Sequence, residues 1–364
     1  MILSRYMAWK FLMAFLGVAA VIACVVLLID MVEQLRRFSG QPLRFSEAVL
    51  LSALRVPGSL YAVLPLVAIL AALAMFVGLA RSAELVVVRA IGRSALRVVA
   101  APALVALALG AAAVAVLNPI VAATTKQYDV VSSRLGGGEV SLLSISREGL
   151  WLREGVGAEQ RVVNALRASP DGQRLFEVSI LGFHPDLGPV ERIEAAEARL
   201  VTGAWELTDA KRWVLRDPNP ERSALRHATL TLPTDLTETG LLDSFAAPIT
   251  IPIWELPEFI ARLDRAGFAA LEHRMWLQSE LALPLTLMAM VLVGAAFTLG
   301  HIRSGRQGMM VLFALLAGFA VFFLRDFTMV LGENGQIPVA LAAWSPPVIA
   351  ALLALGLMLQ LEEG

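Results

Sequence analysis

The stretch FLMAFLGVAAVIACVVLLI, residues Phe11–Ile29, contains 19 consecutive residues without a charge. A helix needs about 20 mostly apolar residues to cross the hydrocarbon core of a bilayer, so this stretch predicts a membrane-spanning helix. It is longer than the apolar core of a secretory signal peptide, and no small-residue cleavage motif follows it. We therefore expect a retained span near the N-terminus.

Further uncharged runs of similar or greater length occur on both sides of a polar central segment. They are Val56–Ala80, Val98–Thr125, Leu281–Gly300, Gln307–Leu324 and Asn334–Leu361. The chain is 57% hydrophobic, with a mean hydropathy of +0.70, which is unusual for a soluble globular protein. These runs predict a polytopic α-helical membrane protein with six transmembrane helices.

Basic residues in short loops indicate the orientation, because they accumulate on the cytoplasmic side. With six spans, eight basic residues fall on the face that holds both termini: Arg5, Lys10, Arg81, Arg89, Arg93, Arg97, Arg303 and Arg306. We therefore expect the termini in the cytoplasm. The opposite face also carries basic residues in its first loop, at Arg36, Arg37, Arg44 and Arg55, and these call for a separate explanation.

The central segment, from Lys126 to Arg274, is polar and rich in alternating β-type patterns. The patterns are SLLSIS, EGLWLREG, RVVNAL, RLFEVSILGF, EARLVTGAWELTD, KRWVLRD and HATLTLPT. Turn signals such as SPDG and DPNP separate them, so seven or eight short strands in an antiparallel sandwich or jelly roll are expected. With the termini inside, this domain is periplasmic.

The sequence PIWELPEFIARLDRAGF, residues 252–268, changes to helical periodicity and predicts a connecting helix before the fourth span. The expected domains are therefore 1–125, with spans one to three, then 126–255, the inserted all-β periplasmic jellyroll-like domain. The last, 256–364, contains the connecting helix and spans four to six.

Motifs for catalysis or cofactor binding are absent from the sequence. It has no phosphate-binding G-x-x-x-x-G-K-[ST] motif and no H-E-x-x-H motif. Its one cysteine is Cys24, and its four histidines lack ligand spacing, so we expect no metal and no cofactor. A formal net charge of −1 argues against nucleic-acid binding. Because the uncharged runs offer no carboxylate or histidine for ion exchange, an ion-coupled transporter is disfavoured.

The stretch RSAELVVVRAIGRS, residues Arg81–Ser94, lies between the second and third spans and forms an amphipathic helix when drawn with 3.6 residues per turn. Its apolar side holds Leu85, Val88 and Ile91, and Glu84 stands at its N-terminal end. Its basic side holds Arg89 and Arg93, and Arg97 continues this spacing four residues after Arg93. One interpretation is a juxtamembrane helix whose arginines contact anionic headgroups. The other is a docking helix for a cytoplasmic protein.

This stretch resembles the S-E-L-x-V-x-x-A-x-G motif of the LptF/LptG (YjgP/YjgQ) permease family of the lipopolysaccharide exporter. The matching residues are Ser82 or Ala83, Glu84, Leu85, Val87, Ala90 and Gly92, beside SRYMAWKFL (Ser4–Leu12), IDMVEQLRR (Ile29–Arg37) and REGLWLREG (Arg147–Gly155). The order of three spans, β domain and three spans also agrees with the family. The G-L-W sequence and IPVALAAWSPPVI are more similar to the LptG branch.

The resemblance implies a permease without its own ATPase activity. It implies pairing with a second, LptF-like permease and with a cytoplasmic ABC ATPase dimer (LptB-like). Lipopolysaccharide would leave the inner membrane and pass through the β domain to a periplasmic bridge of β-jellyroll proteins (LptC/LptA-like). The alternatives are a permease for another envelope lipid or lipoprotein, and a membrane scaffold without transport activity.

The resemblance also implies roles for particular residues. Glu84, with Leu85, Val88, Arg89 and Ile91, would dock into the ATPase. Arg36 and Arg37 would contact the phosphates of lipid A, although snorkelling toward the interface is the alternative for both. The apolar cavity for acyl chains would include Met31, Phe319 and Phe323. Where some relatives carry lysine, this chain has Asp30 and Gly58, so those two contacts are not carried over.

Overall fold

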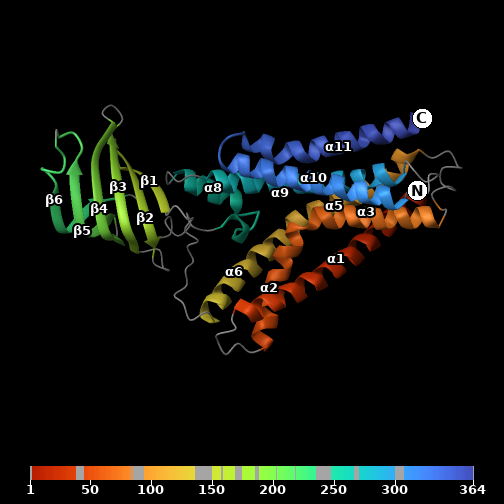
Figure 1. Cartoon of the computed structure of the whole chain (residues 1–364), viewed down its shortest axis with the longest axis horizontal. Coiled ribbons are helices and arrows are strands. Elements are labelled where there is room, and N and C mark those ends of the chain that lie inside the picture. Colours follow the sequence, from red (N-terminus) through yellow and green to blue (C-terminus); the bar gives the residue numbers. More distant parts are fainter. Residues whose placement is uncertain are drawn as a thin grey trace. The chain divides into compact units, whose positions relative to one another are not determined.

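The computed structural model of the chain describes residues 2–37, 45–82, 84, 94–135, 150–156, 159–168, 174–184, 188–201, 203–217, 219–234, 247–265, 270–299 and 307–363. The chain forms two compact units. The first contains Met1–Tyr128, Ile249–Trp254 and Leu271–Gly364, and the second contains Asp129–Pro248 and Glu255–Ala270. The first unit is helical and the second holds a β-sheet (Figure 1).

The first unit is built from long apolar helices. Its elements are α1 (Ile2–Arg37), α2 (Phe45–Ala62), α3 (Leu64–Arg81), α5 (Ala95–Ala112), the π-helix η1 (Ala113–Leu117), the first part of α6 (Asn118–Leu135), α9 (Leu271–Leu299), α10 (Gln307–Glu333) and α11 (Val339–Glu363). Within the described residues, six segments are long and apolar enough to cross a membrane: Ile2–Arg37, Leu64–Arg81, Ala95–Ser132, Leu271–Leu299, Gly308–Glu333 and Val339–Gln360. The prediction of six spans is confirmed.

The second apolar run, Val56–Ala80, does not form one continuous helix. It is divided at Val63 between α2 and α3, with Pro65 in the first turn of α3. Proline has no backbone N–H, so Pro65 cannot donate to the carbonyl oxygen of Tyr61 one turn earlier. Helix α2 begins at Phe45, so Arg55, which the sequence analysis placed in a loop, lies on a helix.

Helix α9 is central in the helical unit, where it packs against α3, α5, α10 and α11. Buried residues occur on all its sides from Ser279 onward, as expected for a helix surrounded by other helices. The crossing with α5 is close at Gly110, where an added Cβ would lie only 2.5 Å from the Cα of Pro284. A side chain at position 110 would therefore push α5 away from α9.

The second unit contains one six-stranded antiparallel sheet. Its strands are β1 (Leu150–Val156), β2 (Glu159–Ala168), β3 (Arg174–His184), β4 (Gly188–Val201), β5 (Ala204–Val214) and β6 (Leu225–Pro233), in the spatial order β1-β2-β3-β4-β5-β6. Buried and exposed positions alternate along the first half of β4, where Ile193 and Ala195 are buried. The next buried residue is Ala198, three positions further on, so the alternation shifts by one residue there. The inserted all-β domain expected from the sequence is present.

The observed strands differ from the expected ones in two respects. EARLVTGAWELTD contains the end of β4 and the start of β5, and KRWV continues β5 instead of forming a separate strand. SLLSIS lies outside the described residues. Among the strands that are described, neighbours in the sheet are neighbours in sequence, so the second sheet and crossovers of a jelly roll are not seen among them.

After the sheet, the short 3-10 helix η2 (Pro248–Thr250) leads to α8 (Leu256–Arg265). Helix α8 confirms the helical periodicity of PIWELPEFIARLDRAGF. Its buried face consists of Leu256, Phe259, Ile260 and Leu263, and it belongs to the second unit. The boundary drawn from the sequence at residue 256 had grouped it with the C-terminal spans.

Candidate functional site

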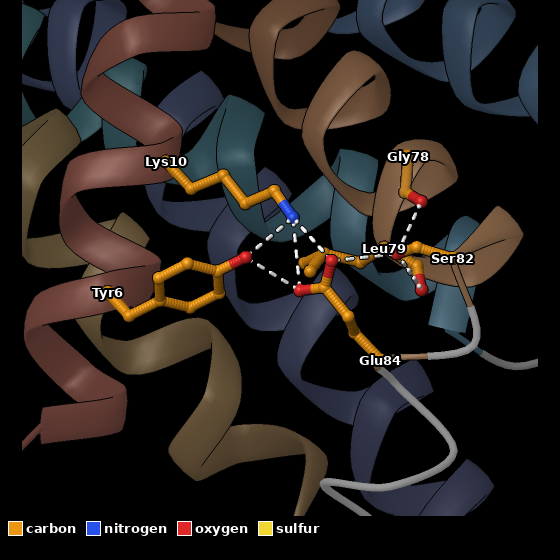
Figure 2. A network of polar contacts seen from close by, with 6 residues as sticks. All are labelled: Tyr6, Lys10, Gly78, Leu79, Ser82 and Glu84. Atoms are coloured by element: carbon orange, nitrogen blue, oxygen red, sulfur yellow. Dashed lines mark hydrogen bonds and ion pairs between the residues drawn. The ribbon is translucent and has the colours of Figure 1, made fainter.

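Glu84 lies three residues after α3, which ends at Arg81, in a network of polar contacts with the first turns of α1 (Figure 2). The Nζ atom of Lys10 is 3.0 Å from both carboxylate oxygens of Glu84. The hydroxyl group of Tyr6 donates to Oε2 at 2.8 Å, and it accepts from Lys10 Nζ at 2.9 Å. Ser82 Oγ lies 2.9 Å from Oε1. Three side chains, those of Tyr6, Lys10 and Ser82, thus meet at the carboxylate of Glu84.

The electrostatics of this network favour the ionised form of Glu84. Hydrogen bonds from Lys10 and then Tyr6 lower the pKa of the Glu84 carboxyl below its ordinary value, against a smaller opposing effect of desolvation. The two ends of the ion pair remain partly accessible, with 32% of the Lys10 side chain and 35% of the Glu84 side chain exposed. Glu84 is therefore a charged group with a fixed orientation and an accessible edge.

The sequence singled out Glu84, and the structure adds its partners. Tyr6 and Lys10 are four residues apart and share one face of α1. Both occur in the SRYMAWKFL stretch, which was the one sequence signal that could have drawn attention to them. The other predicted docking residues, Leu85, Val88, Arg89 and Ile91, lie outside the described residues.

The opposite end of α1 carries the arginine pair, and its two members have different surroundings. Arg36 is exposed and forms an ion pair with Glu33 on the same helix, at 3.2 Å. Arg37 Nη1 donates to the hydroxyl oxygen of Tyr128 at 3.2 Å. The buried Gln34 donates to the same hydroxyl oxygen at 3.0 Å. Arg37 is thus oriented by α6, whereas the contact of Arg36 within the described residues is to its own helix.

Two further charged residues lie at this end of the helix pair. Asp30 of α1 and Arg55 of α2 form an ion pair at 3.6 Å, and the Arg55 guanidinium lies 5.6 Å from the ring centroid of Tyr128. Asp30 therefore has a local counter-charge. Gly58 is the second position at which no substrate contact was carried over. An added Cβ there would meet Val121 Cγ1 at 3.8 Å, which is an ordinary contact distance.

The predicted apolar candidates are distributed over two helices. Phe319 and Phe323 lie four residues apart on α10 with 44% and 66% of their surfaces exposed, and Met31 is half-buried on α1. Helix α10 packs against α9, α11 and α3. The two phenylalanines lie on its exposed surface.

A buried polar cluster that the sequence analysis missed lies inside the helical unit. The Glu280 carboxylate of α9 is 2% exposed. It accepts hydrogen bonds from Tyr61 Oη and from Asn118 Nδ2, the latter at 3.2 Å. Arg325 of α10 interacts electrostatically with this carboxylate and donates to the neighbouring Ser279 Oγ at 3.0 Å. Here four helices share one polar network.

The signal for this cluster was present in the sequence but was read as a boundary. The fourth uncharged run begins at Leu281 because Glu280 is charged, yet α9 begins ten residues earlier at Leu271. Glu280 is therefore inside a helix, packed on all sides, and not in a loop. Among the residues that the structure describes, no group of three or more metal-ligating side chains occurs.

Comparison with known proteins gives a match over nearly the whole chain. A family model described as "Lipopolysaccharide export system permease LptF/LptG" matches residues 5–360. The lipopolysaccharide export system permease protein LptG of Haemophilus influenzae is 23% identical over 353 residues, which cover 92% of this chain and 91% of the relative. LptG of Escherichia coli K12 is 26% identical over 331 residues, covering 90% of this chain and 87% of the relative.

Proposed function

The chain belongs to the LptF/LptG family of lipopolysaccharide export permeases, and we propose that it is the transmembrane permease subunit of an ATP-driven exporter. In this proposal it extracts lipopolysaccharide from the inner membrane and passes it through its β domain to a periplasmic bridge of β-jellyroll proteins. The observation that carries the proposal is the match of residues 5–360, which includes the spans and the β domain together.

ATP hydrolysis is assigned to a separate cytoplasmic ATPase dimer, and a second, LptF-like permease completes the membrane part. The orientation that suits this arrangement has both termini and Glu84 in the cytoplasm and the β-sheet in the periplasm. Glu84 is the proposed contact to the ATPase. Its carboxylate is ionised and partly exposed, and charged groups of this kind give an interface its register and specificity.

The substrate would contact the other end of α1. Lipid A carries phosphates, and a guanidinium group binds phosphate through two parallel hydrogen bonds. Arg36 and Arg37 are the proposed phosphate contacts. Met31, Phe319 and Phe323 are the proposed apolar contacts for acyl chains, which is consistent with the exposure of the two phenylalanines on α10.

The lipid content of the purified complex tests this function. The chain would be co-expressed with its partner permease and ATPase, extracted gently in detergent, and examined by mass spectrometry for lipids and for protein subunits. The expected result is bound lipopolysaccharide together with an ATPase. A complex that holds the ATPase but only phospholipid would indicate a permease for another envelope lipid, and a chain without any ATPase would indicate a scaffold.

A further inference from the structure

Helix α1 has its buried side chains near its two ends, whereas the side chains in its middle are half-buried or exposed. It is 36 residues long, or about 54 Å at 1.5 Å per residue. Its buried residues are Met7, Phe11, Phe15, Asp30 and Gln34, so none lies between residues 16 and 29. Only 6% of its most apolar window is buried. What happens at the two ends therefore determines where this helix lies.

The N-terminal end is held by the packing of Met7, Phe11 and Phe15 and by polar contacts to the carboxylate of Glu84. Lys10 and Tyr6 supply three of the contacts that this carboxylate makes, at 2.8 to 3.0 Å. Ser82 supplies a fourth contact, so the roughly four lone-pair sites of the carboxylate are all engaged, and a further donor must share or displace one of these contacts. A partner that engages the accessible edge of Glu84 would then act on α1 through Lys10 and Tyr6.

The C-terminal end is fixed by contacts of the same kind to α6 and α2. Gln34 and Arg37 both donate to the hydroxyl oxygen of Tyr128, and Asp30 pairs with Arg55. Between the two anchored ends the helix is continuous and contains no proline. Since an uninterrupted helix is kinked only at identifiable features such as proline, a displacement of one end is transmitted to the other.

We propose that α1 is a lever that links Glu84 to the Arg37 end of the helix, and that Lys10 and Tyr6 are the positioning residues that attach Glu84 to it. This inference rests on the proposed function, in which Glu84 contacts the ATPase and Arg37 the substrate. Motion of the docked ATPase moves α1 as one body and shifts Arg37 against Tyr128. Lys10 and Tyr6 act through Glu84 and touch neither ATP nor lipopolysaccharide.

The test compares docking with coupling in the complete complex of both permeases and the ATPase, reconstituted in proteoliposomes with lipopolysaccharide. The two readouts are the amount of ATPase that co-purifies and the lipopolysaccharide released to a bridge protein per ATP hydrolysed. Lys10→Met removes the ion pair of the attachment but leaves Glu84 and its hydrogen bond from Tyr6 in place. Lys10→Arg keeps an ion pair to Glu84. Arg5→Ala removes an exposed cation from the same end of the helix as a matched control.

Lys10→Met is expected to retain the ATPase but to lower the lipopolysaccharide released per ATP by about fivefold or more, the usual lower range of coupling between two sites. Tyr6→Phe has a smaller effect in the same direction, and Lys10→Arg and Arg5→Ala stay near the unmodified complex. A purely structural role would lower the amount of complex and leave the released lipopolysaccharide per ATP unchanged.

Two outcomes overturn the lever alone. In one, Glu84→Ala loses the ATPase while Lys10→Met releases as much lipopolysaccharide per ATP as the unmodified complex. In the other, Lys10→Met loses the ATPase as fully as Glu84→Ala does, so that Lys10 only assists docking. If Glu84→Ala retains the ATPase, the docking role of Glu84 in the proposed function fails, and the lever fails with it.

Discussion

Glu280 and Asn118 are 162 residues apart in the sequence and joined by a hydrogen bond of 3.2 Å inside the helical unit. Asn118 uses its other side-chain atom as well, because its Oδ1 accepts from the backbone N–H of Ile253 at 2.9 Å. The neighbouring Trp254 donates from Nε1 to the carbonyl oxygen of Ala115 in the π-helix, at 3.2 Å. One asparagine thus connects α9 to the chain segment that follows the β domain.

This arrangement predicts a large loss of stability when Glu280 is removed. Glu280→Ala leaves Tyr61 and Asn118 without their acceptor and removes the negative charge that interacts with Arg325 at longer range. Breaking a buried charged network by removing one partner costs on the order of 3–5 kcal/mol. The measurement is thermal unfolding of the detergent-solubilised complex, with Glu272→Ala, an exposed acid on the same helix, as the control.

A conservative variant separates charge from hydrogen bonding. Glu280→Gln keeps an oxygen that accepts from Tyr61 and Asn118, so it is expected to retain more stability than Glu280→Ala. If both variants unfold at the temperature of the unmodified protein, the cluster does not hold the helices together.

The surroundings of the arginine pair predict unequal effects on substrate capture. Arg37 is oriented by Tyr128, whereas the Arg36 side chain is 80% exposed and, among the residues that the structure describes, pairs with Glu33 on its own helix. A side chain that is already oriented loses less entropy on binding, by about 0.5–1.5 kcal/mol. Arg37→Glu is therefore expected to reduce crosslinking to lipopolysaccharide more than Arg36→Glu does, as measured with a photoactivatable residue introduced on α10.

Tyr128→Phe checks the cause of that difference, since it removes the hydroxyl group that orients Arg37 but leaves the charge. Its crosslinking should lie between that of the unmodified protein and that of Arg37→Glu. Equal losses for Arg36→Glu and Arg37→Glu, with no effect of Tyr128→Phe, would contradict the role given to Tyr128.

The proposed orientation predicts from which side of the membrane an impermeant reagent can label each unit. In a Cys24→Ser background, a membrane-impermeant maleimide should label Thr229→Cys on β6 once the outer membrane is permeabilised. Arg5→Cys should be labelled only after the inner membrane is opened. Both positions are exposed, so accessibility within the fold does not limit the reaction. If Arg5→Cys were labelled while the inner membrane is still closed, the orientation would be the opposite of the proposed one.

The sequence was sufficient to predict the spans, because an uncharged run of about 20 residues has one common structural meaning. It was less informative about helix ends. Charges were taken as boundaries, so Glu280 was placed just outside the span that begins with α9 at Leu271. The division at Val63 was missed because Pro65 was read as part of one apolar run.

Glu84 was identified from its position in a short motif, but its partners were not. Lys10 lies 74 residues earlier and Tyr6 78 residues earlier, and no periodic pattern connects two helices that meet only through tertiary packing. For the same reason, the contact of Arg37 with Tyr128 could not be predicted from the sequence. Local patterns predict elements, while pairings between distant polar residues depend on how the elements pack.

The contact between Lys10 and Glu84 should contribute little to stability, which is a further check on its role. The pair is partly exposed, and exposed ion pairs contribute at most about 1 kcal/mol. Because the pKa of Glu84 is lowered in the folded protein, the contribution is present above the ordinary carboxyl pKa and is lost as pH falls through the lower, folded-state pKa.

Lys10→Met is therefore expected to unfold within a few degrees of the unmodified protein at neutral pH, and the small difference should disappear at acidic pH. The measurement is thermal unfolding at pH 7 and at a pH below the carboxyl range. A large difference at pH 7 would show that Lys10 maintains the fold itself. In that case, a loss of transport in Lys10→Met would no longer report on the attachment of α1 to Glu84.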